Sequence, residues 1–361
     1  MTTAATTPER SADGSAPAAG APVVRSGLLS GNRIRLLGLA VATAVLVAVT
    51  LGSVLLGTLP VGLSDVVGAV TDSADSDVER AVRYIRIPRT VTGLLAGMAL
   101  GLAGVVMQGL TRNPLAGPGL LGINAGAALA VVSAMVGLGI TSAAGYVWFA
   151  FAGAAVAAVF VYMLGSLGPG GATPVKLALA GSALTALLGA VTTMITLQDA
   201  STMEDFRYWV VGSLTRSDSD ALAAVAPFIA VGVVLAVGLT RALNALALGE
   251  DLARSLGARV WVDRIAGALA VVLLAGGATA IAGPVGFIGL VVPHIARMIT
   301  GSDYRWVLAW TIVLAPMLLL IADILGRLLV QPEQLQVGII TGLVGAPFFL
   351  YLVRNRKVVG T

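Results

Sequence analysis

Long apolar runs recur from residue 34 almost to the end of the chain, and they limit the possible folds more than any other feature of the sequence. A helix that crosses the hydrocarbon core of a bilayer needs about 20 mostly apolar residues. Because that core holds no water, the backbone must satisfy its own hydrogen bonds, as a helix does. The predicted fold class is therefore all-α, a polytopic membrane protein with about ten transmembrane helices. These spans are expected near residues 34–58, 87–110, 119–139, 145–167, 174–196, 220–243, 262–282, 285–300, 306–329 and 335–353.

Lysines and arginines in the loops predict the orientation of these helices. An even number of crossings places both termini on one side, and cytoplasmic loops carry an excess of Lys and Arg. With both termini cytoplasmic, most of the 22 basic residues fall on the inner side. Four of the exceptions gather before the second span and need another explanation. The outer side holds Arg80, Arg83, Arg86, Arg89, Arg207 and Arg216, with Arg327 near an outer helix end.

The first 30 residues differ from the rest of the chain. They are rich in Ala, Thr, Ser, Pro and Gly and show no apolar periodicity, which is typical of a disordered tail. A secretory signal would have a basic segment followed directly by an apolar run, and this order is missing. We therefore expect two regions, a disordered and uncleaved cytoplasmic tail at 1–30 and a transmembrane domain at 31–361.

Several kinds of chemistry have no residues to perform them. The chain has no cysteine and a single histidine, His294, so thiolate sites are excluded and a histidine metal site is not expected. The predicted spans hold no paired carboxylates. We therefore expect no catalytic residues, no metal ligands and no enzymatic activity. The net charge of +4 reflects membrane orientation and predicts no binding of nucleic acid.

Nucleotide binding also lacks its usual motif. The two lysines, Lys176 and Lys357, both lie outside a G-x-x-x-x-G-K-[ST] sequence, so the chain has no P-loop. If ATP drives its work, a partner chain must bind the nucleotide.

Charged residues at the predicted outer side permit two interpretations. Arg86 and Arg89 lead into the second span, where they could extend to the interface or could dock an acidic partner through paired contacts with carboxylates. Asp323 and Arg327 are four residues apart, so they can pair on one helix face. That pair is either satisfied within the helix or orients Arg327 toward a partner outside.

Two predicted inner loops carry further information. Gln108, Thr111 and Asn113 put polar groups where a helix stops, which reflects either turn chemistry or a narrow point in a pore. Residues 248–257 predict a short amphipathic helix that ends at Gly257. Its apolar face is expected to hold Leu248, Leu252, Ala253 and Leu256. This helix either lies on lipid or fits a groove on a cytoplasmic partner.

The second span contains glycines at four-residue spacing, at positions 93, 97 and 101. Small residues at this spacing let two membrane helices approach closely. We expect a close helix–helix contact along this stripe.

Taken together and in this order, these stretches resemble the FecCD family of ABC importer permeases, which take up ferric siderophores, haem and vitamin B12. The resemblance covers roughly residues 34–355. The matching segments are Arg86–Arg89, Gln108–Gly122, Gly283–His294, Ala322–Asp323, Pro332–Glu333 and Gly345–Phe349. It implies a permease domain in the bacterial cytoplasmic membrane that pairs with a second permease subunit, identical or paralogous. Two cytoplasmic ATPase subunits would bind ATP, and an extracytoplasmic substrate-binding protein would dock outside.

The resemblance also implies roles for particular residues. Binding-protein docking falls to Arg86, Arg89 and Arg327. The ATPase coupling helix comprises Gly249, Glu250, Asp251, Leu252, Ala253, Leu256 and Gly257. The cytoplasmic gate comprises Asn113, Leu115, Thr173 and Pro174, with proline standing where a small hydroxyl residue can occur in relatives.

The predicted function is that of the membrane permease of a binding-protein-dependent ABC importer for ferric siderophore, which works by alternating access. A haem or cobalamin importer is the alternative within the same class. An ion-coupled secondary transporter is a more distant alternative, and Asp323 would be its candidate coupling group.

Overall fold

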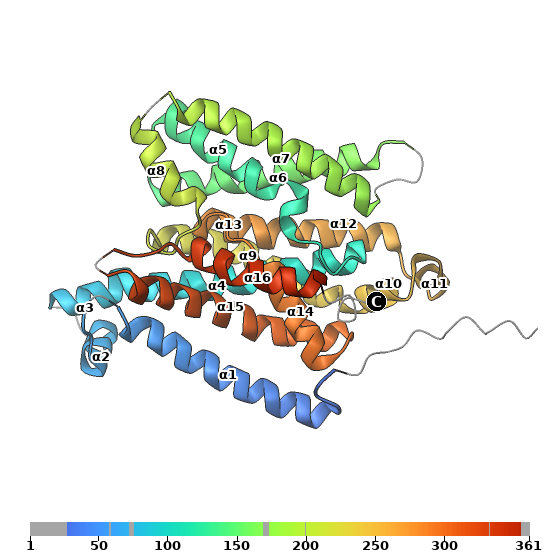
Figure 1. Ribbon diagram of the computed structural model, residues 1–361, viewed down its shortest axis with the longest axis horizontal. Helices are drawn as coiled ribbons and strands as arrows, with labels where there is room; N and C mark the ends of the chain where they lie inside the picture. Colours follow the sequence, from blue (N-terminus) through green and yellow to red (C-terminus); the bar gives the residue numbers. More distant parts are fainter. Residues whose placement is uncertain are drawn as a thin grey trace, which may run out of the picture.

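The described part of the chain is a bundle of helices (Figure 1). The computed structural model describes residues 27–57, 59–71, 76–168, 173–198, 200–331 and 333–354, and within them every regular element is helical. The first eight helices are α1 Asn32–Leu55, α2 Leu63–Thr71, α3 Asp77–Ala81, α4 Ile87–Thr111, α5 Ile123–Leu138, α6 Ala143–Ser166, α7 Pro174–Thr196 and α8 Ala200–Val210. The others are α9 Ser219–Gly238, α10 Thr240–Ala247, α11 Glu250–Ser255, α12 Val260–Val271, α13 Gly277–Ala282, α14 Ile288–Thr300, α15 Tyr304–Leu329 and α16 Val337–Arg354.

The helices coincide with the apolar runs of the sequence. Among the described residues, seven helical segments are long and apolar enough to cross a membrane, and three more apolar helices are shorter. The long segments are Asn32–Leu55, Asp77–Thr111, Ala143–Ser166, Val175–Thr196, Ser219–Gly238, Val260–Ala282 and Tyr304–Leu329. The short ones are Ile123–Leu138, Ile288–Thr300 and Val337–Tyr351. The predicted all-α membrane fold is confirmed, and the number of ten crossings stays a prediction.

Helix α4 forms the centre of the bundle. It packs against α9, α12, α13, α14 and α15, and most of its length is buried. Helices α5 to α8 form a layer on one side of this centre, and α1 lies along the opposite side (Figure 1). Two π-helical turns, Val82–Arg86 and Val272–Gly276, join α3 to α4 and α12 to α13, so that each pair continues as one long rod.

The predicted glycine stripe is the contact between α4 and α15. A Cβ added at Gly97 would lie 2.6 Å from the Cα of Pro316 and 3.0 Å from the carbonyl oxygen of Ala315. Both are backbone atoms, so no side-chain rotation could make room. The close helix–helix contact expected from the spacing is confirmed.

The two described ends of the chain lie at the same end of the bundle. Helix α1 begins and α16 finishes at the right of Figure 1, beside α10 and α11, whereas α2, α3 and α8 lie at the left. We call these the inner and the outer end, following the predicted orientation. This arrangement matches an even number of crossings.

Most of the predicted N-terminal tail, residues 1–26, lies outside the described residues. Its last residues are part of the fold, because the backbone N–H groups of Leu28 and Leu29 donate to the carbonyls of Met298 and Ile299 at the end of α14, at 3.0 and 2.9 Å. The predicted C-terminal boundary at residue 361 also falls outside the described part.

Candidate functional site

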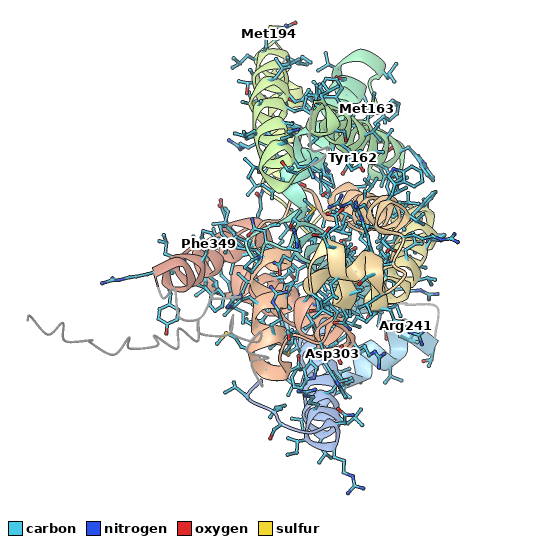
Figure 2. All side chains as sticks on the ribbon, turned by 90° about the vertical axis from the view of Figure 1, so that its right-hand side faces the viewer. Tyr162, Met163, Met194, Arg241, Asp303 and Phe349 are labelled. Carbon is cyan, nitrogen blue, oxygen red and sulfur yellow. The ribbon has the colours of Figure 1, made fainter. Side chains whose placement is uncertain are left out.

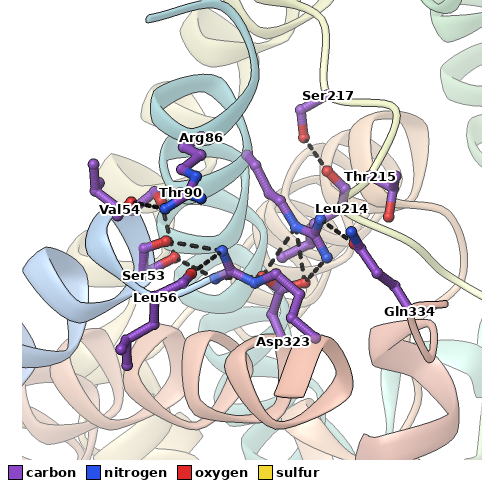
Figure 3. Close-up of polar contacts among 12 residues, drawn as sticks. Ser53, Val54, Leu56, Arg86, Thr90, Leu214, Thr215, Ser217, Asp323 and Gln334 are labelled. Atoms are coloured by element: carbon purple, nitrogen blue, oxygen red, sulfur yellow. Dashed lines mark hydrogen bonds and ion pairs between the residues drawn. The ribbon is translucent and has the colours of Figure 1, made fainter. Parts of the chain in front are cut away.

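Asp323 lies at the centre of a buried charge cluster at the outer end of the bundle (Figure 3). Its carboxylate accepts from Arg89 Nη2 at 2.8 Å and from Arg89 Nε at 3.1 Å. Arg327, one turn farther along α15, places Nη2 3.0 Å from the other carboxylate oxygen. The predicted pairing of Asp323 with Arg327 is confirmed. Sequence reasoning missed Arg89 as a partner, because 234 residues separate it from Asp323 and no spacing rule connects them.

Arg327 and a third arginine, Arg86, which is labelled in Figure 3, also bind the end of α1. Arg86 Nη1 donates to the carbonyls of Val54 and Leu55, both at 2.8 Å, while Arg327 Nη1 donates to those of Ser53 and Leu56, both at 2.9 Å. The last carbonyls of a helix have no partner within the helix, and a cation there also interacts favourably with the helix dipole. The two guanidinium groups therefore cap α1 and fix it to α4 and α15.

Burial decides what these arginines can contact directly. Arg86, Arg89 and Arg327 are 7%, 5% and 3% exposed, and their guanidinium groups point into the protein. The exposed arginines at this end are instead Arg80, Arg83, Arg207 and Arg216, on or beside α3 and α8. The docking role of the three buried residues stays a prediction. The structure adds that they organise the outer end from within.

A cavity of about 440 Å³ opens beside the cluster. Its lining includes Tyr208, Trp209 and Arg216 from α8 and the loop after it, and Gln334 and Gln336 from the segment before α16. Gln334 also accepts from Arg89 Nη1 at 2.7 Å, so the cavity wall is joined to the charge cluster. Sequence reasoning did not identify this cavity, because its lining comes from segments more than 100 residues apart.

The predicted short helix at 248–257 is present as α11 at the inner end (Figure 1). Leu252 and Leu256 are 50% and 65% exposed, and Leu248 is exposed as well. Ala253 is fully buried with Leu246 and Val260, so it does not point the same way as the exposed leucines with which the sequence grouped it on one helical face. Ala253 instead fixes the helix to α10 and α12, and the leucines alone form the exposed surface.

Polar contacts hold α11 in place. Glu250 accepts from Arg254 at 2.7 Å and from Arg264 of α12 at 2.8 Å. Gly249 and Gly257, on either side of the helix, have φ of +110° and +86°, where side chains with a Cβ are strained. Asp251 is exposed. The predicted helix stop at Gly257 is confirmed.

The predicted gate residues lie at two places at the inner end, the turn after α4 and the start of α7. Asn113 Oδ1 accepts from the N–H of Leu115 at 2.9 Å, which closes the turn after α4. Thr173 caps α7 by accepting from the N–H of Lys176, and Pro174 is the first residue of α7. Leu115 lines a small cavity with His294 and Phe348, whereas Leu177, one turn after Thr173, lines another with Arg112.

One interpretation of the sequence placed Gln108 at a narrow point of a pore. In this structure Gln108 is instead buried between helices. It is 2% exposed, accepts from Arg297 Nη2, and donates to the carbonyl of Gly289 at 3.3 Å. Thr111 donates to the carbonyl of Met107 in its own helix. Gln108 therefore joins α4 to α14, and of the three polar residues only Asn113 belongs to the loop itself.

Comparison with known proteins identifies the family. The model of the FecCD transport family matches residues 45–355. The ferric enterobactin transport system permease protein FepD of Escherichia coli is 45% identical over 86% of this chain and 93% of its own length. The cobalamin import system permease protein BtuC of Halobacterium salinarum is 38% identical over 77% of this chain and 74% of its own length.

A solved structure described as an inward-facing conformation of a metal-chelate type ABC transporter has the same fold, with a TM-score of 0.76 and 26% identity over 89% of this chain and 99% of the other. The helical fold, the sequence motifs and the length of the match all agree with membership of this family. The chain belongs to the FecCD transport family and is a multi-pass membrane permease of the ABC importer class.

Proposed function

We propose that this chain is the permease through which a ferric siderophore crosses the cytoplasmic membrane. The observation that carries the proposal is the 45% identity to a ferric enterobactin permease across 86% of the chain. The cavity at the outer end supports it, because Tyr208, Trp209 and Arg216 offer aromatic faces and a cation to a large polar cargo. A haem or cobalamin cargo is the alternative, supported by the cobalamin permease at 38% identity.

Energy would come from ATP on two cytoplasmic ATPase subunits, since this chain has no P-loop and is proposed to hold no cofactor of its own. Helix α11 is the proposed contact. Its exposed leucines, Leu252 and Leu256, form an apolar surface at the inner end, and the ion pair between Glu250 and Arg264 transmits a push on α11 to α12. Closure of the ATPases would then rock this subunit against a second permease subunit, identical or paralogous, in alternating access. The inner gate is proposed at Asn113, Leu115, Thr173 and Pro174.

An extracytoplasmic binding protein is proposed to dock at the outer end. Its acidic groups would meet the exposed Arg80 and Arg83, on a surface whose shape depends on Arg86, Arg89 and Arg327 beneath it. Arg80→Glu with Arg83→Glu should weaken the affinity of the binding protein and leave folding intact. If the affinity of the binding protein is unchanged, Arg80 and Arg83 are not the contact. The three buried arginines would then be the contact and would have to become exposed on docking.

Asp323 argues against ion-coupled transport. Its carboxylate is bound by Arg89 and Arg327 and is 1% exposed, so it has no open side on which to take up and release a proton or a sodium ion. Asp323 is therefore unsuited to ion coupling, and the ion-coupled alternative loses its candidate coupling group among the described spans.

The decisive experiment is reconstituted uptake. The tagged chain is purified with its co-purifying subunits, placed in liposomes with the ATPase domains outside, and supplied inside the lumen with a binding protein loaded with ferric siderophore, haem or cobalamin. We expect ATP-dependent export of the siderophore from the lumen, which is the import direction. ATP-dependent movement of haem or cobalamin alone would replace the cargo assignment. Transport without ATP would overturn the ABC mechanism.

A paired variant tests the coupling surface in the same assay. Leu252→Asp with Leu256→Asp should abolish transport while the ATPases retain basal hydrolysis. Ser255→Asp, at an exposed polar residue of the same helix, is the control for added negative charge at the inner end. Normal transport by the Leu252/Leu256 variant would mean that α11 lies on lipid instead.

A further inference from the structure

A groove of about 540 Å³ lies between helices at the inner end, apart from the docking, coupling and gate residues. One wall is the end of α9 and the start of α10, and the other is the first two turns of α15. Figure 2, which faces this end of the bundle, labels Arg241 of α10 and Asp303, the residue before α15. The groove is lined by Val237, Gly238, Thr240, Arg241, Arg305, Leu308, Ala309 and Ile312.

Charge and apolar surface are separated along this groove. On α15 the lining residues are Arg305, Leu308, Ala309 and Ile312, at spacings of three and four that define one helix face. The arginine is in the first turn, and the apolar residues follow toward the middle of the span. On the facing wall Arg241 is likewise at the inner end, and Val237 lies one turn deeper. Two guanidinium groups thus stand at the mouth of an apolar channel.

The mouth lies at the inner ends of two apolar helices, where we expect the membrane to meet water. Helix α9 ends at Gly238 and α15 begins at Tyr304, so both arginines sit at helix ends. Beside them Trp306 packs under the guanidinium of Arg35, 5.8 Å from the ring centroid, and tryptophan is enriched at this level of a bilayer. By the predicted orientation this is the cytoplasmic leaflet, which carries anionic lipids.

The two arginines are available for a ligand. Both are exposed, and among the described residues neither side chain has a hydrogen-bond or ion-pair partner. The neighbouring acid, Asp303, accepts from Asn244 Nδ2 and from the N–H of Arg305, both at 3.0 Å. Asn244 also accepts from the N–H of Tyr304 at 3.0 Å. These bonds join α10 to the start of α15 at the rim of the groove.

We propose that this groove is a binding site for an anionic phospholipid of the cytoplasmic leaflet. The phosphate lies between Arg241 and Arg305, and one acyl chain follows Leu308, Ala309 and Ile312 into the bilayer. Guanidinium groups suit phosphate because they donate two parallel hydrogen bonds. A soluble anion would use the arginines but not the apolar channel, and an apolar protein segment would leave both charges unpaired. A phospholipid satisfies both halves of the groove.

Native mass spectrometry of the purified full chain with its co-purifying subunits tests the proposal. The sample is titrated with dioleoylphosphatidylglycerol or with dioleoylphosphatidylcholine, and bound lipids are counted. Arg241→Gln with Arg305→Gln should weaken retention of the anionic lipid by about 30-fold, since each arginine near a charged lipid surface contributes to binding. Arg33→Gln with Arg259→Gln, two exposed arginines of the same predicted side outside the groove, is the charge-matched control and should retain the lipid.

A second variant keeps the charge and tests the channel. Ala309→Phe fills the apolar wall, so it should also lower retention of phosphatidylglycerol, and excess inorganic phosphate should not displace the lipid from the wild type. The proposal is overturned if the groove variant retains lipid like its control, or if inorganic phosphate competes. It is overturned equally if the groove variant loses an ATPase or a second permease while the bound lipid is unchanged, because the groove would then be a protein interface.

Discussion

Replacing Asp323 by alanine tests the buried charge cluster most directly. The substitution removes the carboxylate that pairs with both Arg89 and Arg327 in the described structure. Arg89 would lose bonds of 2.8 and 3.1 Å and keep only Gln334, while Arg327 would keep the carbonyls of α1. Removing one partner of a buried ion pair costs about 3–5 kcal/mol, because it leaves an uncompensated charge.

Unfolding of the purified chain by sodium dodecyl sulfate in mixed micelles measures this loss. We expect Asp323→Ala to lower the free energy of unfolding by about 4 kcal/mol. Asp77→Ala removes a carboxylate that is 99% exposed and lies 3.5 Å from Arg80, so it serves as the control and should cost about 1 kcal/mol or less.

A double variant separates charge from packing. Arg89→Met in the Asp323→Ala background removes the cation that the first change left unpaired, so it should recover a large part of the loss. The reasoning is refuted if Asp323→Ala resembles Asp77→Ala, or if adding Arg89→Met lowers stability further by its full single-variant effect.

Two further substitutions probe helix contacts by the same unfolding measurement. Gly97→Ala should destabilise by about 1–3 kcal/mol because its Cβ meets the backbone of Pro316, whereas Gly189→Ala, with open space around it, should be neutral or stabilising, and equal effects would contradict the tight α4–α15 contact. Gln108→Leu should cost about 2–3 kcal/mol because Arg297 loses its hydrogen-bond acceptor, and a neutral result would show that Arg297 finds another partner.

The sequence predicted what depends on local pattern. Each apolar run became a helix, because a helix satisfies its backbone hydrogen bonds within one segment, away from water. The break at residues 283–287, which separates α13 from α14, followed from Gly283 and Pro284. The pairing of Asp323 with Arg327 followed from their spacing on one helix.

Features that depend on how distant segments pack could not be predicted in this way. The partner of Arg89 lies on a helix 234 residues away, and the burial of Ala253 depends on where α10 and α12 pass. Arg86 illustrates the same limit. Its position before the second span indicated an outer charge, but only the location of the α1 terminus shows that the charge points inward.

The capping of α1 also has a consequence for biosynthesis. Arg86 lies about 32 residues after the carbonyl of Val54, so it can bind the end of α1 as soon as α4 has entered the membrane. Arg89 enters with it, yet its counter-ion is translated 234 residues later. Until α15 is inserted, the growing chain carries a cation near the outer surface whose carboxylate does not yet exist. The charge cluster at the outer end therefore combines residues from early and late parts of the chain. Insertion of the ninth predicted span, which carries Asp323, completes it.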